Sequence, residues 1–194
     1  MRFPFCLLLA EANFSDYLKW GKIMITFTQE VDRWNCCYTK CGGACCKKGH
    51  ALTLFDINAI SKKLGVDWHE FADFDKEKLR FYLKGNDDGK AKEGKNDVMC
   101  TFLKDDLSCS IYDVKPLVCR LLPFEIKGVS LSDEPLLQLK ALDVCPGYGH
   151  GPKLDDAAMW QIERDATLYL HENQKLCRKF KEDPKKVLKE YASD

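Results

Sequence analysis

Cysteine is the residue type in this sequence that points most directly to chemistry. The chain of 194 residues holds eleven cysteines, several times the usual number for its length. Five of them fall between Cys36 and Cys46, a run that also contains Gly42 and Gly43. Thiolates bind zinc at about 2.3 Å, so several can reach one metal only if the backbone curls tightly. The two glycines allow the positive φ angles that such a curl needs, and the run therefore predicts a metal site.

A second group of cysteines is spread through the middle of the chain. Its members are separated by 8, 9 and 25 residues, and they are Cys100, Cys109, Cys119 and Cys145. The first run contributes Cys37, Cys41, Cys45 and Cys46. Eight thiols suffice for one four-thiolate cluster with four spare, or for two four-thiolate sites. Adjacent side chains tend to project in different directions, so Cys45 and Cys46 favour a polynuclear cluster or two neighbouring sites.

Two other interpretations of the cysteines compete with metal binding. A disulfide framework is typical of small secreted domains, but the cysteine count is odd and the chain can bury an ordinary core. Buried free thiols behave as small hydrophobic side chains, and this interpretation accounts for Cys6 and Cys177 and remains open for Cys36. Chance burial does not group thiols at turn spacing, so it does not explain the run from Cys37 to Cys46.

Histidines and basic residues near the cysteines are the next candidates for the site. His50 and His150 follow the last cysteine of each group, but eight thiols already suffice and we expect neither to be a ligand. His69 and His171 show no partner pattern. Four thiolates around zinc or a [4Fe–4S] cluster leave a negative charge that needs nearby cations. The basic residues close in sequence are Lys40, Lys47, Lys48 and Arg120, of which Lys47 and Lys48 are expected to be solvated surface.

Three stretches of the chain resemble a known family. They are Cys37 to Cys46; Leu52-Thr53 followed by Asp56; and the segment from Cys100-Thr101-Phe102-Leu103 through Cys109-Ser110-Ile111-Tyr112 to Lys115-Pro116-Leu117-Val118-Cys119-Arg120-Leu121-Leu122-Pro123. The chain is similar here to the YkgJ-like cysteine-cluster proteins, whose domain also occurs in flagellin lysine N-methylases and is expected to chelate zinc or iron. The resemblance implies eight metal ligands, Cys37, Cys41, Cys45, Cys46, Cys100, Cys109, Cys119 and Cys145.

The sequence departs from the usual pattern of that family in its cysteine spacing and at two other positions. Three residues rather than the more familiar two separate Cys37 from Cys41 and Cys41 from Cys45, and Lys115 and Leu122 stand where arginine and phenylalanine are common. The altered spacing leaves the choice between Cys36 and Cys37 open.

Charge and composition restrict the partners. Hydrophobic residues make up 45% of the chain and charged residues 31%, which is typical of a globular protein. The 30 basic and 30 acidic residues cancel, so no overall field attracts nucleic acid or anionic membranes. No stretch approaches the ~20 apolar residues of a membrane helix. The sequence therefore predicts a protein partner and neither nucleic acid nor membrane as a partner.

The first 24 residues are interpreted as an N-terminal extension. Residues 2–12 imitate a secretion signal, but the apolar run is short and contains Pro4. We therefore expect a cytoplasmic protein. Met24 is an alternative start, because the apolar pattern becomes dense only after Ile25.

Helices and short strands are expected to position the cysteines. Thr53, with Asp56 three residues later, predicts a capped helix that continues through Ile57, Ile60 and Leu64 to Gly65. Asp67 can cap a second short helix carrying Trp68 and Phe71. Strands are expected near 81–83 and 98–103, with residues 85–97 as an exposed loop between them.

The last part of the sequence is expected to be helical. Pro116 predicts the first turn of a short helix that carries Cys119 and stops before Pro123. Met159, Ile162, Ala166 and Tyr169 recur at helical spacing, and Asp183-Pro184 begins a final helix with Val187, Leu188 and Tyr191. The fold prediction is helix-rich α+β, with a cysteine-cluster domain over 25–150 and a C-terminal helical segment over 151–194 packed on it.

Three kinds of function fit these features. The first is an iron–sulfur protein, with a cluster of the [4Fe–4S] type, that acts in electron transfer or metallocluster assembly with a protein partner. The second is a zinc-stabilised structural or interaction module, and the third is an accessory subunit of a protein-modifying, methylase-like enzyme. The cysteine spacing is not that of radical S-adenosylmethionine enzymes, and a nucleotide loop and a hydrolase triad are absent, so we expect no intrinsic catalysis.

Overall fold

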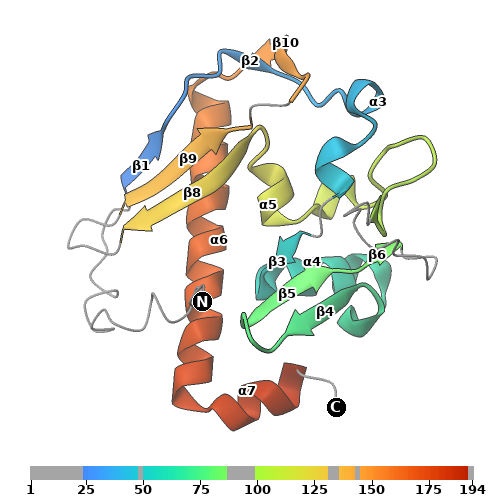
Figure 1. The fold of residues 1–194 in the computed structure, drawn as a ribbon, viewed down its shortest axis with the longest axis vertical. Coiled ribbons are helices and arrows are strands. Elements are labelled where there is room, and N and C mark those ends of the chain that lie inside the picture. Colours follow the sequence, from blue (N-terminus) through green and yellow to red (C-terminus); the bar gives the residue numbers. More distant parts are fainter. Residues whose placement is uncertain (1–23, 48–49, 87–98, 131–135, 143–144, 192–194) are drawn as a thin grey trace.

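The computed structural model describes residues 24–47, 50–86, 99–130, 136–142 and 145–191. These residues form a mixed α+β fold in which small sheets are arranged around one long helix, α6 (Figure 1). Helical residues, at 45%, outnumber strand residues, at 24%, which confirms the expected helix-rich α+β class. Within the described ranges, no helix is both long and apolar enough to cross a bilayer.

Most strands of the structure are short. In chain order the elements are β1 (Met24–Phe27), β2 (Arg33–Trp34), α3 (Tyr38–Cys41), η1 (Ala44–Lys47), β3 (Ala51–Leu52), α4 (Leu54–Leu64), η2 (Trp68–Glu70), β4 (Ala72–Asp75), β5 (Arg80–Leu83), β6 (Gly85–Asn86), β7 (Met99–Cys100), η3 (Tyr112–Val114), α5 (Leu117–Arg120), β8 (Phe124–Ser130), β9 (Leu136–Ala141), β10 (Tyr148–Lys153), α6 (Asp156–Glu182) and α7 (Pro184–Tyr191).

An upper core lies between one sheet and the first half of α6. The sheet has the order β1-β9-β8, with β1 parallel and β8 antiparallel to β9. Leu137 and Leu139 on β9 are fully buried, and they belong to one apolar cluster with Ile162 and Ala166 of α6. Figure 1 shows this sheet crossing in front of the upper half of the helix.

A lower core is built from α4, the sheet β3-β5-β4 and the C-terminal helices. Phe81 on β5 is fully buried, and its ring contacts Tyr191 of α7 at 5.1 Å between centroids. Leu176, near the end of α6, belongs to the same cluster. Because α6 contributes buried residues to both cores, it connects the two halves of the molecule.

The structure confirms the helices that local sequence signals predicted. Thr53 caps α4, and its hydroxyl accepts from the Asp56 N–H while the Asp56 carboxylate accepts from the Thr53 N–H, forming the expected capping box. Gly65 ends this helix in the left-handed conformation at φ 70°. Leu64 is 41% exposed and lies outside the core, contrary to its place in the predicted apolar stripe. Helix α5 begins after Pro116, which is its N-cap.

The strands agree less well with the prediction. The strand expected at 98–103 is reduced to Met99–Cys100, because residues 101–103 turn back towards Cys109. Gly85 and Asn86 pair with β7 instead of opening the loop, and residues 87–98 lie outside the described residues. The hairpin β8–β9, its parallel partner β1 and the pair β10–β2 were not predicted.

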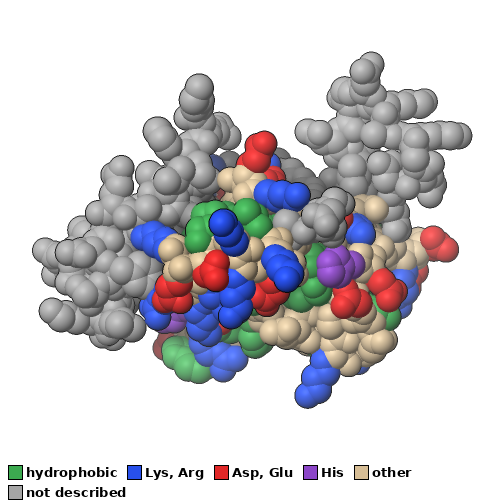
Figure 2. Space-filling model, turned by 90° about the horizontal axis from the view of Figure 1, so that it is seen from below, with side chains coloured by type: hydrophobic (Ala, Val, Ile, Leu, Met, Phe, Trp, Pro, Cys, Tyr) green, Lys and Arg blue, Asp and Glu red, His purple; other side chains and the backbone are tan. Residues whose placement is uncertain are grey.

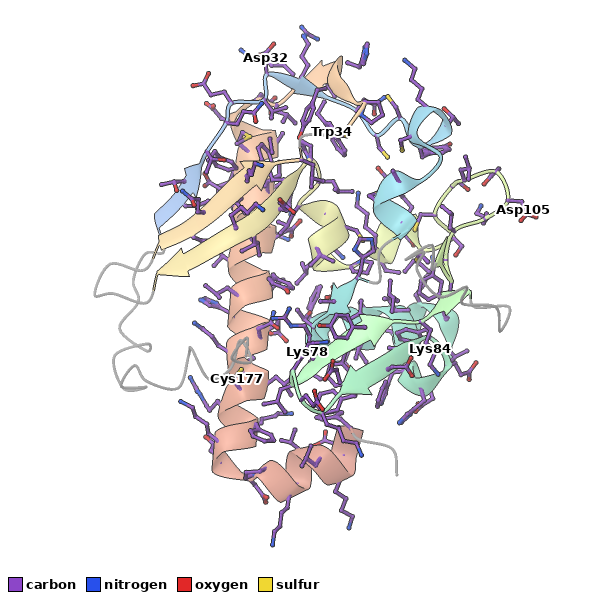
Figure 3. The ribbon with its side chains drawn as sticks, in the orientation of Figure 1. Asp32, Trp34, Lys78, Lys84, Asp105 and Cys177 are labelled. Carbon is purple, nitrogen blue, oxygen red and sulfur yellow. The ribbon has the colours of Figure 1, made fainter. Side chains whose placement is uncertain are left out.

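Cys177 was expected to be a buried free thiol. It is buried, but it is disulfide-bonded, so the prediction of a free thiol is wrong. Its partner lies outside the described residues, as does Cys6, and sequence spacing alone cannot pair distant cysteines. Figure 3 shows Cys177 on the lower half of α6, whereas α3 lies at the opposite, upper end of the molecule in the same orientation (Figure 1).

Candidate metal centre

The first cysteine run folds as two short helices joined by the two glycines. Gly42 and Gly43 adopt φ angles of 59° and 66°, which confirms the left-handed turn predicted between α3 and η1. A Cβ at Gly43 would lie 3.2 Å from a methyl group of Leu103, so glycine also permits close packing of the next cysteine segment. The turn therefore brings η1 against the region of Cys100 and Cys109.

Cys45 and Cys46 converge despite being adjacent in the sequence. Both lie on η1, and their Sγ atoms are 3.9 Å apart. The two thiols are this close although successive residues of a 3₁₀-helix project about 120° apart. The Cys46 thiol donates to Cys45 and lowers the pKa of Cys45 to about 7, which leaves the pKa of Cys46 raised. Cys45 is consequently the more acidic thiol of the pair.

Cys100, Cys109 and Cys119 form a group beside η1. Cys109 pairs with Leu103 in an antiparallel bridge, which folds the chain back towards Cys100 on β7. Both cysteines pack against the lower core. Burial raises the pKa of Cys119, and the thiols of Cys100, Cys45 and Cys109 raise it further. These thiols are thus within electrostatic reach of one another.

Cys145 joins the first run through β2 and β10. The indole Nε1 of Trp34 donates to the Cys145 Sγ at 3.3 Å, and Figure 3 shows Trp34 between the upper sheet and α3. Asn35 donates its N–H to the Gly147 carbonyl at 3.2 Å. A Cβ at Gly147 would lie 2.1 Å from the Asn35 carbonyl oxygen, so only glycine permits this approach. An N–H···S contact of this kind stabilises a thiolate.

A cavity of about 520 Å³ lies between the first run and the upper core. Five thiols line it, and four of the sequence-predicted ligands are not among its lining residues. Its walls are Trp34, Cys36, Cys37, Cys41, Ala44, Cys45, His50, Val118, Leu121, Leu122, Phe124, Glu125, Ile126, Leu142, Cys145, Pro146 and Tyr169. Cys36, left open by the sequence, therefore faces the same space as Cys37.

Among the described residues, Lys115 is a cation that acts on the thiols. Its charge lowers the pKa of Cys45, after the larger effect of Cys46, and it also opposes the burial that raises the pKa of Cys119. Arg120 lies elsewhere, since its guanidinium is 5.8 Å from the Phe55 ring and its Nε donates to the Lys115 carbonyl at 2.8 Å. Lys40 is exposed, and the side chains of Lys47 and Lys48 lie outside the described residues.

The four histidines fall in different places. His50 lines the cavity, whereas His150 on β10 is exposed and is not among the lining residues. His69 pairs with Asp67 on η2, and His171 lies on α6. His50 is therefore the histidine that shares the space of the thiols.

Asp56 connects the α4 terminus to the helix that carries Cys119. Its carboxylate is buried and accepts from the Leu117 N–H at 2.8 Å, in addition to the two donors of Thr53. Burial raises the pKa of Asp56, and these donors oppose the rise. The hydrogen bond to Leu117 fixes the start of α5 and hence the position of Cys119.

The donor set fits a soft metal. All nine cysteines from Cys36 to Cys145 are free thiols, and thiolates are the ligands of zinc and of iron–sulfur clusters. Within the described residues, no three side chains of ligand type meet closely enough to hold a single ion as they stand. Five of the thiols border one cavity, so metal binding there requires them to move closer together.

The chain was compared with family models, with curated proteins and with solved structures. Residues 35–146, more than half of the chain, match the family model "CxxCxxCC: Putative zinc- or iron-chelating domain". The matched range contains every thiol described above. A search of curated proteins found no match, and a search of solved structures found none.

Proposed function

Because this chain belongs to the CxxCxxCC family, we propose that its cysteines hold an iron–sulfur centre. The observation that carries the proposal is the cavity of about 520 Å³ bordered by five thiols. A zinc ion fills the space among thiolates that lie about 2.3 Å from it, whereas a cluster needs room between its cysteines. A bound cluster would supply one-electron chemistry.

The surroundings of the thiols support such a centre. Trp34 would donate a hydrogen bond to the sulfur of Cys145, and Lys115 would offset part of the negative charge of the thiolates. Hydrogen bonds to the sulfurs, net charge and solvent exposure set the potential of an iron–sulfur cluster. These two residues would therefore tune the centre without being ligands.

The biological role we propose is electron transfer or metallocluster assembly with a protein partner. The distinctive residues of the site are thiols, and an apolar cavity wall adjoins them. The role needs a partner because a cluster in a carrier has to receive or donate electrons or metal. We place this role in the cytoplasm, where thiols remain reduced and available as ligands.

A zinc-stabilised module is the second candidate, and one distance favours it. Two thiolates on a tetrahedral zinc ion are about 3.8 Å apart, given Zn–S distances of about 2.3 Å. Cys45 and Cys46 have their Sγ atoms 3.9 Å apart, which suits one edge of such a tetrahedron. In this case the metal would stabilise the fold and carry no electrons.

Anaerobic purification separates the two candidates. We expect a brown protein with iron and acid-labile sulfide in similar amounts, and with absorption near 400 nm that is bleached by dithionite. A colourless protein with stoichiometric zinc and no sulfide would establish the zinc module instead. The double variant Cys41→Ser/Cys45→Ser is the matched control and should lose the colour. Anaerobic pull-down from native extract then tests for the partner.

A further inference from the structure

A second hollow, a groove of about 570 Å³, opens at the surface of the upper core. Its walls come from strand β1, from the loop that follows this strand and from the start of α6, and they include Thr26, Val31 and Met159. Among the described residues, no cysteine lines it. The groove is therefore separate from the cavity that five thiols border.

The groove adjoins that thiol-bordered cavity at two places. Phe124 lines both spaces, and its ring meets the ring of Phe27 in the groove edge to face, with 5.0 Å between centroids. Asp32 lines the groove, and Trp34, two residues later, lines the cavity and donates to the Cys145 sulfur. Figure 3 shows Asp32 and Trp34 at the same, upper end of the molecule. A molecule in the groove would therefore lie against the wall of the cavity.

The floor of the groove is apolar and partly exposed. Phe27, Val31, Leu154 and Met159 pack against the buried cluster of the upper core, yet each keeps part of its surface in solvent. Removal of exposed apolar surface from water favours association. The floor therefore suits an apolar side chain of another molecule.

The charged residues that line the groove are both acidic. They are Glu30 and Asp32, and both are exposed. Asp155 and Asp156, also exposed, directly follow Leu154 of the floor. The rim of the groove thus carries negative charge around an apolar floor.

The basic residues next to the rim do not cancel this charge. Arg33 lies 3.8 Å from the Asp32 carboxylate, but it also donates to the Gly151 carbonyl at 3.0 Å and does not line the groove. Lys153 pairs with Arg33 between β10 and β2 and does not line the groove either. The rim is therefore complementary to a segment in which basic side chains flank an apolar one.

We propose that this groove is the docking site of the protein partner, and that it accepts a partner segment with basic side chains on either side of an apolar one. The partner then exchanges one electron with the metal centre across the wall that Phe124 forms. This inference rests on the proposed function, because it takes the centre behind Phe124 to be redox-active.

A short fluorescein-labelled peptide of alternating lysine and leucine is the probe for the groove, and fluorescence anisotropy measures its binding. Asp32→Lys and Glu30→Lys should each weaken binding roughly 10-fold. Asp105→Lys is the matched control, because it makes the same change of charge at an exposed residue on a loop away from Asp32 (Figure 3), and it should leave binding unchanged.

A second peptide, with serine in place of leucine, tests the apolar floor. It keeps the charge but should bind roughly 10-fold more weakly, because it buries no apolar side chain. Absence of binding by the leucine peptide, equal binding of the two peptides, or equal losses in Asp32→Lys and Asp105→Lys would each overturn the docking site.

The reduced holoprotein tests whether the groove serves the metal centre. After excess dithionite is removed, the cation hexaammineruthenium(III) takes one electron from the centre and becomes ruthenium(II), and stopped-flow absorption follows the rate. Saturating leucine peptide should slow this reaction several-fold in the wild-type protein and less in Asp32→Lys. An unchanged rate would overturn the assignment of the groove to an electron-transfer partner. Peptide binding by a protein without an iron–sulfur centre would overturn the proposed function and the electron exchange, while the docking site would stand.

Discussion

At the level of single residues, the two adjacent cysteines at the start of the run have different surroundings. Burial raises the pKa of Cys36, and the thiols of Cys45 and Cys41 lie close enough to raise it further. Cys37 caps α3, and its thiol is turned towards the Asn35 carbonyl. These surroundings favour Cys36 as a ligand, whereas the resemblance to the family favours Cys37.

We predict that Cys36→Ser lowers the metal content more than Cys37→Ser. Each variant is the matched control of the other, because the substitution and the local sequence are the same. Elemental analysis of the two anaerobically purified proteins makes the comparison. A larger loss in Cys37→Ser would support the assignment from the family resemblance and contradict the one from geometry.

Trp34 supplies a second prediction, because its indole N–H donates to the Cys145 sulfur. Trp34→Phe keeps the aromatic ring but removes the donor, and we expect the metal affinity to fall roughly 10-fold. Competition against a chromophoric chelator measures this change. Trp160→Phe, on the exposed part of α6, is the control and should leave the affinity unchanged. Equal affinities for the two variants would show that the hydrogen bond has no effect.

At the level of elements, Asp56 holds the starts of α4 and α5 together. Asp56→Ala leaves three buried donors without an acceptor, namely the Thr53 N–H and hydroxyl and the Leu117 N–H. We expect a loss of about 3 kcal/mol in the free energy of unfolding, measured by urea denaturation. Asp67→Ala removes a similar but exposed cap of η2 and should cost less. A small effect of Asp56→Ala would mean that α5 is positioned by packing alone.

The helices could be predicted because their signals are local. The Thr53–Asp56 capping box, Gly65 and the apolar spacing of α6 lie within a few residues of the structure they determine. The hairpin β8–β9 also had a signal, since Leu137 and Leu139 alternate with polar residues on β9. The parallel pairing of β1 with β9 had none, because Met24 and Leu136 pair although they are far apart in the sequence.

The candidate site also has some features with a local signal in the sequence and others without one. The cysteine run and its glycine turn could be predicted from the spacing of the cysteines, because thiols that share a metal require a tight turn of the backbone. The contact of Trp34 with Cys145 joins residues 111 positions apart, and the sequence offers no signal for it. The role of Lys115 was also missed, because its distance from Cys36, Cys45 and Cys119 depends on how α5 meets η1.

At the level of the whole molecule, the basic and acidic side chains are intermixed. Figure 2 shows Lys and Arg next to Asp and Glu over the face that is seen from below. This mixture agrees with the equal numbers of basic and acidic residues in the chain. On that face, a partner would therefore be selected by shape and local contacts rather than by one overall sign of charge.

The C-terminal helix α7 closes the lower core, and a change of Tyr191 tests this. The Tyr191 ring contacts Phe81, Phe74 and Trp68, and its side chain is 9% exposed. Tyr191→Ala should lower the free energy of unfolding by about 3 to 5 kcal/mol, while the folded variant keeps its metal. Calorimetry and elemental analysis measure the two effects. Trp160→Ala, an exposed aromatic change, should affect neither, and loss of metal from folded Tyr191→Ala would contradict the prediction.

Helix α6 contributes Ile162 and Ala166 to the upper core and Leu176 to the lower core. Because this helix is unbroken over its 27 residues, melting it in one core removes contacts from the other. We therefore expect the two cores to unfold as a single cooperative unit, without an intermediate in which only one of them is folded. A calorimetric scan should show one transition whose van't Hoff enthalpy equals the calorimetric enthalpy, even though the chain contains two separate apolar clusters.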